Sequence, residues 1–561
     1  MPADDLASTL LGVLLTSHPL DASILGLTGY DDKLPDLSSE AQDEEVAALR
    51  RVAADAARLG DAVDEVERQT ADLVRTSAGA RADAAAVPIV EFTVADFHSA
   101  PVTEVLMMLT KVPLDTAARK DAYLARLEGL GGVLERALER HLAGVGAGRL
   151  PVRRLVRAAV AQLDAFLADP ELGGIRRATA ADGEFVDRLD RTLEATVRPA
   201  LGAYRDALSS RLVDAGRDDD HCGLRHLPDG DVMYAALTRL HTSTDRTPGE
   251  LHDMGVEIVE RVNDEYRQLG GRLWGLTDLG AVIERLRDDP SLRYEDAEQI
   301  LSDARTVVAR AEEAAPAWFG ELPATSCKVE PVPAVEEAGS APAYYLPPAL
   351  DGSRDGTYFV NTSRATERSR ADAETIAFHE AVPGHHFQLA IAQNQPGLSL
   401  PRRVLWDTAC AEGWGLYAER LADEMGLYSS DLARLGMLTA DMWRAGRLVV
   451  DTGIHAQGWT RERAVEWFGA HTPLPAVVIE AEVNRYIANP GQALAYMVGR
   501  VELVRLRREA TERLGARFDL RGFHDVVLRA GPLPLPAMAG VVERWAAKVG
   551  ETRVGGRPGR G

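Results

Sequence analysis

The stretch that decides how this sequence is interpreted is His379-Glu380-Ala381-Val382-Pro383-Gly384-His385-His386. It places three imidazoles and a carboxylate within eight residues, and these groups are the usual ligands of a catalytic zinc ion. In the familiar helical pattern H-E-x-x-H, two histidines four residues apart share one face, and the glutamate between them acts as general base. Here the position four after His379 is Pro383, so the simple pattern is absent.

The spacing of the histidines therefore requires a break in the helix. In an undisturbed helix, residues six apart point about 120° away from each other and cannot easily bind one ion. Pro383 removes a backbone donor, and Gly384 permits conformations closed to other residues. If these two residues bulge out of the helix, His385 becomes the second ligand and His386 falls one residue past the site. The alternative is a helix that ends at Pro383, with the histidines in a surface turn.

A third ligand is available further along the chain. Glu412 lies 33 residues after His379, in a segment with helical spacing. Two adjacent antiparallel helices would bring its carboxylate against the histidines. Glu419, seven residues later, competes for the same role but lies two turns away. The alternative for either residue is an ordinary solvated carboxylate on a helix surface.

These motifs resemble those of the bacterial DUF885 family, whose helical proteins are similar in arrangement to the gluzincin zinc peptidases. The family pattern H-E-x-x-P-G-H is matched by His379, Glu380, Pro383, Gly384 and His385. A later pattern, E-G-W-x-x-Y, is matched by Glu412, Gly413, Trp414 and Tyr417. Weaker matches are D-x-G-x-H at 451–455, P-G-Q-A-x-x-Y-x-x-G at 490–499 and a strand at 356–361. The likeness extends from about residue 10 to residue 545.

The predicted fold is mostly α: a large multi-helix fold that encloses a cleft, with a small β-hairpin or sheet before the zinc-binding helix. Residues 40–80 and 115–215 are rich in helix formers with three-four spacing. Thr247 is expected to cap a helix, with Pro248 at its first position and Glu250 three after the cap. Helix is expected to continue to about residue 318 with an interruption near Asp289-Pro290, and to return from Arg370 to about 549.

Three regions follow from this pattern. Residues 1–245 form a predicted N-terminal helical region, and residues 246–549 form a catalytic region with short strands. Residues 550–561 are rich in glycine and arginine and are predicted to be a disordered tail. Residues 344–346 and 358–360 are the two predicted strands. We expect Tyr358 to Asn361 to be an exposed edge that can pair with an extended peptide; a purely structural hairpin is the alternative.

Composition narrows the classes of function. The net charge of −23 argues against nucleic acid or an anionic membrane as a partner, since both bind basic surfaces. The three cysteines, Cys222, Cys327 and Cys410, are odd in number and widely spaced, which excludes a disulfide framework and fits a reducing compartment. The N-terminus resembles no signal peptide, so a cytoplasmic location is expected. The oligomeric state stays open.

The expected chemistry uses one zinc ion per chain, held by His379, His385 and Glu412, although manganese or cobalt would accept the same ligands. Glu380 is expected to act as general base. The family resemblance and the residue types point to His455 and Tyr496 as further donors to the oxyanion. The remaining expected substrate-binding residues are Asn361, His386, Arg447, Tyr486, Gln492 and Arg505.

The sequence therefore predicts a zinc-dependent hydrolase that cleaves peptide or amide bonds of short peptides. One alternative is an amide hydrolase specialised for a single small metabolite. Another is a non-catalytic protein of the same fold that binds metal or peptide. Glu380 beside both histidines argues against this last alternative, because binding alone needs no base.

Overall fold

The computed structural model describes residues 2–60, 64–177, 183–333, 337, 341–349 and 354–551 of the chain. The predicted fold class is confirmed, since the described residues are mostly helical and contain one small three-stranded sheet. Of the predicted tail 550–561, residues 552–561 lie outside the described residues, and residues 550 and 551 end the last helix.

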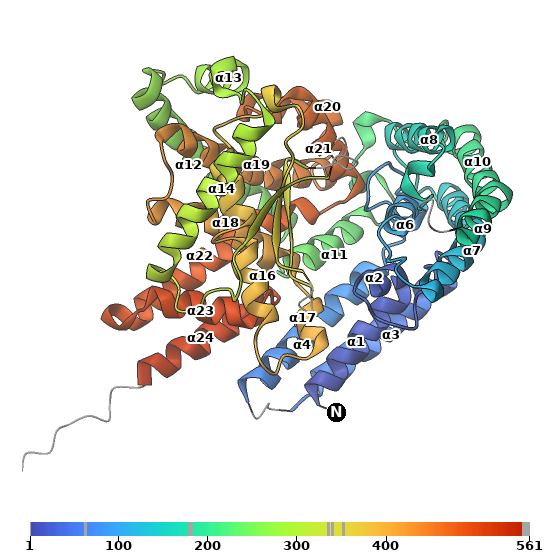
Figure 1. Cartoon of the computed structure of the whole chain (residues 1–561), viewed down its shortest axis with the longest axis horizontal. Helices are drawn as coiled ribbons and strands as arrows, with labels where there is room; N and C mark the ends of the chain where they lie inside the picture. The colour runs from blue at the N-terminus through green and yellow to red at the C-terminus, as the bar shows by residue number, and fades with distance from the viewer. Residues whose placement is uncertain are drawn as a thin grey trace, which may run out of the picture.

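The N-terminal helices occupy the right and the lower centre of Figure 1. They are α1 (Ala3–Ser17), α2 (Pro19–Ile24), α3 (Ser39–Ala57), α4 (Glu65–Ala85), α5 (Ile89–Phe92), α6 (Pro101–Leu109), α7 (Ala117–Gly146), α8 (Arg153–Ala168), α9 (Glu184–Thr192) and α10 (Arg198–Ala207). Helix was predicted over 40–80 and 115–215, and both predictions are confirmed, with short breaks between the individual helices.

Four helices connect this part to the sheet: α11 (Gly230–Thr242), α12 (Pro248–Trp274), α13 (Leu279–Asp288) and α14 (Ala297–Ala314). The start of α12 is the predicted one, because Thr247 and Glu250 form a reciprocal capping box. The predicted interruption near Asp289-Pro290 separates α13 from α14. In Figure 1, α11 lies between the N-terminal helices and the helices at the left.

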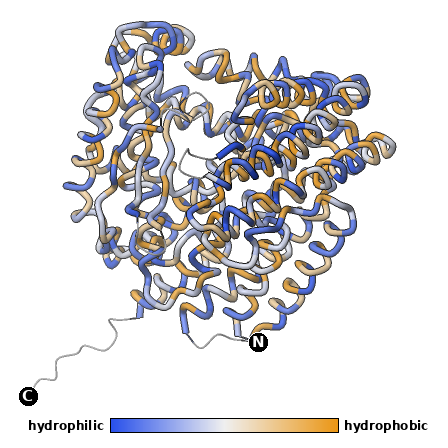
Figure 2. The backbone as a smooth tube through the Cα atoms, turned by 45° about the vertical axis from the view of Figure 1, so that its right-hand side comes forward, coloured by the Kyte–Doolittle hydropathy of each residue, from blue (hydrophilic) through white to orange (hydrophobic). Residues whose placement is uncertain are grey.

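The remaining helices follow the sheet. They are α15 (Ala373–Glu380), α16 (His385–Gln393), α17 (Leu400–Val404), α18 (Thr408–Glu424), α19 (Asp431–His455), α20 (Arg461–His471), α21 (Ala476–Ala488), α22 (Ala495–Leu514), α23 (Leu520–Ala530) and α24 (Leu535–Glu551). Most helices alternate hydrophobic and hydrophilic residues along their length (Figure 2) and bury one face, whereas α18 and α19 are buried along most of their residues. The three cysteines are buried and free.

One hydrophobic core joins the two ends of the chain. It contains Leu6 of α1 and Val542 of α24, and α4 packs against both α11 and α24. A second core lies within residues 20–212. The boundary near residue 245 stays a sequence-based prediction, since the first core crosses it.

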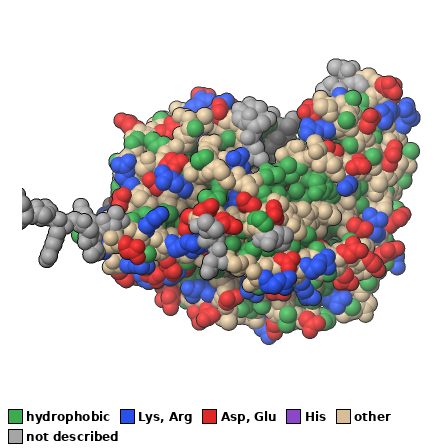
Figure 3. All heavy atoms as spheres, turned by 90° about the horizontal axis from the view of Figure 1, so that it is seen from below, with side chains coloured by type: hydrophobic (Ala, Val, Ile, Leu, Met, Phe, Trp, Pro, Cys, Tyr) green, Lys and Arg blue, Asp and Glu red, His purple; other side chains and the backbone are tan. Residues whose placement is uncertain are grey.

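On the face seen in Figure 3, basic and acidic side chains are interspersed over the described residues, with hydrophobic side chains exposed between them.

The sheet has three strands, β1 (Lys328–Pro331), β2 (Ala343–Leu346) and β3 (Thr357–Val360), in the order β1-β3-β2. The two predicted strands are present and antiparallel, with Tyr345 opposite Tyr358. The prediction that Tyr358 to Asn361 form an exposed edge is wrong, because β1 pairs with β3 in parallel on its other side. The edge next to β3 is therefore β2.

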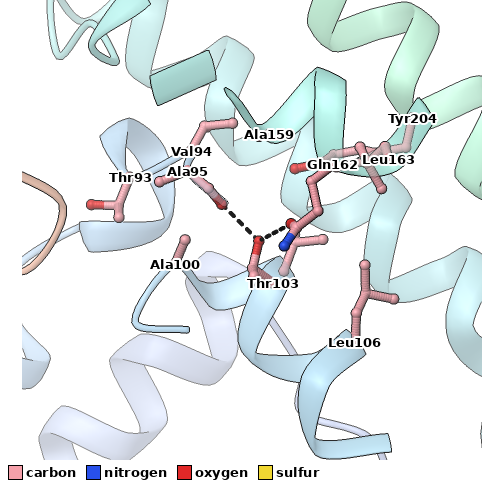
Figure 4. A pocket seen from close by; sticks show the side chains of 11 residues that line it. Thr93, Val94, Ala95, Ala100, Thr103, Leu106, Ala159, Gln162, Leu163 and Tyr204 are labelled. Atoms are coloured by element: carbon pink, nitrogen blue, oxygen red, sulfur yellow. Dashed lines mark hydrogen bonds between the residues drawn. The ribbon is translucent and has the colours of Figure 1, made fainter. Parts of the chain in front are cut away.

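A small cavity lies in the N-terminal part, between α6 and α8 (Figure 4). Its volume is about 10 Å³, which is room for a single water molecule. The Thr103 hydroxyl is 2.7 Å from the Ala95 carbonyl oxygen and 3.5 Å from Gln162 Oε1. Among the described residues no charged side chain lines this cavity, so it is a feature of helix packing and offers no chemistry.

Helices α18 and α22 approach closely at two glycines. A Cβ atom at Gly499 of α22 would overlap the carbonyl oxygen of Ala409, and one at Gly413 of α18 would overlap the Gly499 backbone. Small residues at both positions let the two backbones touch, as at other close helix crossings. This contact fixes the position of α18, which carries Glu412.

We expect Gly499→Ala to lower the free energy of unfolding by at least about 2–3 kcal/mol, because the added methyl group meets backbone atoms that cannot rotate away. Gly79→Ala in α4 is the matched control, since a Cβ there meets nothing within 4 Å. Removing that helical glycine is expected to stabilise the protein by about 0.5–1 kcal/mol. Urea unfolding midpoints of the wild type and both variants measure the two effects. A Gly499→Ala midpoint equal to that of the wild type would contradict the close contact between α18 and α22.

Candidate metal centre

The two histidine helices are separated by a four-residue turn. Helix α15 ends at Glu380 and α16 begins at His385, with non-helical backbone at Ala381 (φ −106°, ψ −98°) and Gly384 (φ −77°, ψ −127°). A Cβ atom at Gly384 would overlap the His379 carbonyl oxygen, so a larger residue would disrupt this turn. The break brings the rings of His379 and His385 to a centroid distance of 4.8 Å, nearly perpendicular to each other.

Helix α18 supplies the carboxylate that completes the cluster. Glu412 Oε2 lies 3.5 Å from His379 Nε2 and 3.6 Å from His385 Nε2. The indole Nε1 of Trp414, on the same helix, donates to the carbonyl oxygens of Pro383 (2.9 Å) and Gly384 (3.2 Å). The helix that carries the carboxylate is thus tied to the turn that positions the histidines.

The donor set fits a zinc ion. Among the described residues, His379, His385 and Glu412 form the one group of three or more potential ligands whose atoms all lie within 4.8 Å of one another. Bonds of 2.0–2.1 Å in a tetrahedron place neighbouring ligand atoms about 3.4 Å apart. The two printed nitrogen–oxygen distances are close to this value. Two imidazoles and one carboxylate also match the ligand type of catalytic zinc sites.

A second buried carboxylate orients the first histidine. Glu419, with no exposed surface, accepts from His379 Nδ1 at 2.8 Å. The residue expected to compete with Glu412 therefore contacts the other ring nitrogen and leaves Nε2 directed at the cluster. A carboxylate behind a ligating histidine fixes the tautomer and raises its basicity.

The electrostatics of the cluster favour a cation. Burial alone would lower the pKa of His379, but hydrogen bonds to Glu412 and Glu419, with the charge of Glu380, raise it to about 10. Burial would raise the pKa of Glu412, but both histidines hold it well below its usual range. A site that stabilises positive charge on an imidazole in this way also stabilises a bound divalent cation.

The cluster lies on the wall of a large cavity of about 690 Å³. This volume lies in the range that holds small-molecule and short peptide ligands. Glu380 lines the same cavity, one residue after His379. Burial raises its pKa, and the two histidines oppose that effect. A carboxylate with a raised pKa accepts and keeps a proton more readily than an exposed one.

Three further predicted residues line this cavity: Asn361, Arg447 and Tyr496. The amide nitrogen of Asn361 lies 3.4 Å from the Ala341 carbonyl oxygen, so Asn361 also supports the chain beside β2. Tyr496 lies under the guanidinium of Arg447, whose central carbon is 4.4 Å from the ring centroid. Burial raises the pKa of Tyr496, and Glu412 adds to that effect, so this phenol stays a hydrogen-bond donor.

His386 lies away from the cluster. Its Nδ1 is 2.9 Å from the Tyr345 hydroxyl, and its Nε2 is 3.0 Å from the Thr325 carbonyl oxygen. Burial lowers its pKa to about 4. It does not line the cavity; it joins α16 to β2 and to the chain before β1, and its expected contact with substrate stays a prediction.

His455 is also displaced from its expected role as an oxyanion donor. Its Nδ1 accepts from the Leu224 backbone at 3.1 Å, and its Nε2 lies 3.0 Å from the Tyr486 carbonyl oxygen. The ring has no exposed surface, and burial lowers its pKa to about 3. Asp451 of the same motif accepts from Tyr234 and from the Gly491 backbone. The D-x-G-x-H motif therefore fastens α19 to neighbouring segments.

Tyr486, Gln492 and Arg505 also lie outside the residues that line the cavity. The Tyr486 hydroxyl donates to Glu482 at 2.6 Å, and Gln492 accepts from Arg485 at 2.7 Å. Arg505 pairs on the surface with neighbouring acidic residues of its own helix. The structure therefore does not bring these three residues to the cavity, and their expected contacts with substrate stay predictions. Sequence reasoning missed Arg444, which lines the cavity one helical turn before Arg447; that three-residue spacing was the available signal.

The fold and the site together define a large helical protein with a potential metal-binding cluster on the wall of a large cavity. The chain belongs to the family described as "Bacterial protein of unknown function (DUF885)", which matches residues 19–542. The family assignment made from the sequence motifs is thus confirmed.

Two solved structures share the fold, and each is described as a "putative lipoprotein". That of Colwellia psychrerythraea is 26% identical, with a TM-score of 0.87 over 98% of this chain and 100% of that one. That of Shewanella oneidensis, described as of unknown function, is 17% identical, with a TM-score of 0.77 over 96% of this chain and 99% of that one. No curated protein matches this sequence. Within the described residues, no helix has the length and apolar character needed to cross a membrane.

We expect His379→Ala, His385→Ala and Glu412→Ala each to abolish stoichiometric zinc binding, because each removes one of three ligands. His386→Ala is the matched control and is expected to keep about one zinc per chain. Elemental analysis of the purified variants after zinc loading measures this. Zinc retained in His385→Ala and lost in His386→Ala would contradict the assignment of the second ligand.

We expect Glu419→Gln to weaken zinc binding by about tenfold to a hundredfold without abolishing it, because the orienting carboxylate behind His379 becomes a neutral amide. Competition with a chromophoric chelator measures the affinity. Glu424→Gln on the same helix is the control, since Glu424 is an exposed partner of Arg507. Equal affinity in wild type and Glu419→Gln would remove Glu419 from the account of the site.

Proposed function

We propose that this protein is a zinc-dependent hydrolase that cleaves peptide or amide bonds in short peptides. One observation carries the proposal: Glu380 lines the cavity directly beside His379, His385 and Glu412, whose ligand atoms converge. A histidine followed by a glutamate, with a second histidine and a later glutamate, is also the arrangement of the gluzincin peptidases that the sequence resembles. Structural zinc sites prefer cysteine ligands, so this donor set favours a catalytic role.

In this proposal His379, His385 and Glu412 would hold one zinc ion. When bound, zinc supplies Lewis acidity, which acidifies a water molecule and polarises a substrate carbonyl. Glu380 takes the proton from the attacking water and later passes it to the leaving amine. The Tyr496 hydroxyl, on the cavity wall, donates to the oxygen on which negative charge develops.

The shape of the cavity supports a short or flexible substrate. The candidate cluster is buried among helices, with His379 only 4% exposed, so a folded protein cannot reach it. Exposed apolar residues also line the cavity, namely Trp406 (51% exposed) and Val477 (72% exposed). Apolar side chains at these positions favour peptides with apolar residues over highly charged ones.

We expect Glu380→Gln to reduce peptide hydrolysis by at least about a hundredfold, because the amide cannot accept the proton of the attacking water. Zinc content and the unfolding midpoint are expected to stay close to wild type. Glu367→Gln is the matched control, since Glu367 lines the same cavity but pairs with exposed Arg364.

The measurement is release of products from a pool of short peptides, followed by mass spectrometry. A zinc-loaded wild type that binds peptides but cleaves none would favour a non-catalytic binding protein. Undiminished cleavage by Glu380→Gln would contradict the role of Glu380 as general base.

A further inference from the structure

Two arginines of α19 line the cavity, and each has a buried nitrogen without a hydrogen-bond partner among the described residues. Arg447 is 5% exposed, and its Nη1 is buried without a hydrogen-bond partner. Arg444, three residues earlier on the same cavity wall, has a buried Nε without a partner. Within the described part of the chain, no hydrogen bond or ion pair to the Arg444 guanidinium occurs. Leaving such donors unsatisfied is costly, and a bound acceptor would remove that cost.

Hydrogen bonds and aromatic rings fix the guanidinium group of Arg447. It donates to the Tyr486 hydroxyl (3.2 Å) and to Glu482 (3.1 Å). Its guanidinium also lies over the rings of Trp443 (4.7 Å) and Tyr496 (4.4 Å). Arg444 contacts Trp443 in the same way, at 4.7 Å. The guanidinium groups are therefore fixed before a ligand arrives, which lowers the entropic cost of binding one.

Basic groups predominate immediately around Arg447, although the whole chain carries a net charge of −23. Glu482 contacts both Arg447 and Arg485. Two guanidinium groups therefore share one carboxylate, and Arg444 adds a third positive charge. The carboxylates of Asp372 and Glu380 line the same cavity, but among the described residues neither forms a hydrogen bond or ion pair with Arg444. The two arginines and the proposed base thus line one cavity.

We propose that Arg444 and Arg447 form a carboxylate-binding subsite, and that the substrates are peptides with a free C-terminal carboxylate. Guanidinium groups bind carboxylates through paired, charge-assisted hydrogen bonds. This inference rests on the proposed hydrolase function and narrows it to cleavage near the C-terminus. Water adds across the amide bond: its oxygen ends in the new carboxylate of the N-terminal fragment, and its proton passes through Glu380 to the amine of the released C-terminal fragment.

The first experiment measures binding without turnover, in zinc-loaded Glu380→Gln protein. The probe is acetyl-Ala-Ala-Phe, as the free acid and as the carboxamide, and isothermal titration calorimetry gives both affinities. We expect the free acid to bind about tenfold to a hundredfold more tightly, because only this form accepts charge-assisted hydrogen bonds. Equal affinity of the two forms, or no binding of either at millimolar concentration, would overturn the subsite.

Variants in the same Glu380→Gln background assign the effect to the two arginines. Adding Arg444→Gln, which breaks no hydrogen bond within the described protein, is expected to bring the acid-to-amide ratio below about threefold. Adding Arg447→Lys keeps the charge but removes the planar donor pair, and is expected to lower the ratio as well. Arg508→Gln, at an exposed position of α22, is the control and should leave the ratio unchanged. An unchanged ratio in Arg444→Gln would overturn the role of that residue.

A turnover experiment separates failure of this inference from failure of the proposed function. Wild-type protein is given the same peptide as free acid and as carboxamide, and products are identified by mass spectrometry. Cleavage of both forms at equal rates would overturn the carboxylate subsite while leaving a hydrolase. Acid-selective binding without any cleavage would overturn the hydrolase while leaving the subsite. Acid-selective cleavage near the C-terminus supports both.

Discussion

The indole of Trp414 holds together the parts on which the candidate site depends. Its single N–H donates to two carbonyl oxygens of the turn between α15 and α16. Trp414 has no exposed surface, and its indole is the donor to the buried Pro383 carbonyl, while the Gly384 carbonyl also accepts from the Gln388 backbone N–H. Because Glu412 lies on the same helix, two residues earlier, one interaction relates the carboxylate to both histidines.

Behind that contact, α18 is fixed on several sides. Gly413 touches α22, and Glu419 contacts His379. Further along, Arg420 binds Asp441, a carboxylate without exposed surface that also accepts from Arg500. Each named residue of the E-G-W-x-x-Y motif therefore has its own contact. Glu412 supplies the carboxylate of the cluster, Gly413 makes the close contact with α22, and Trp414 anchors the turn. The Tyr417 hydroxyl lies 2.9 Å from His524 Nε2. Successive residues serve different neighbours because the helix turns them in different directions.

How much the sequence predicted depends on how local each feature is. The break at Pro383-Gly384 follows from the chemistry of two adjacent residues, and the helix start at Thr247 follows from a four-residue pattern. The position of β3 within the sheet was not predictable in the same way, because β1 lies about 30 residues upstream in a proline-rich segment. The orienting role of Glu419 depends on the relative rotation of α15 and α18, which no local pattern encodes.

The predicted site residues that lie away from the cavity show the same limit of local patterns. Histidine and tyrosine are typical of catalytic sites, but their ring nitrogens and hydroxyls also satisfy buried backbone groups. The Nδ1 of His455 satisfies a backbone N–H 231 residues away, a pairing that exists only in the folded chain. Residue type therefore predicts that a side chain has a polar partner, while the fold decides which one. Arg444 illustrates the converse, since a buried donor whose partner the described protein does not supply is the kind of group that points to a ligand.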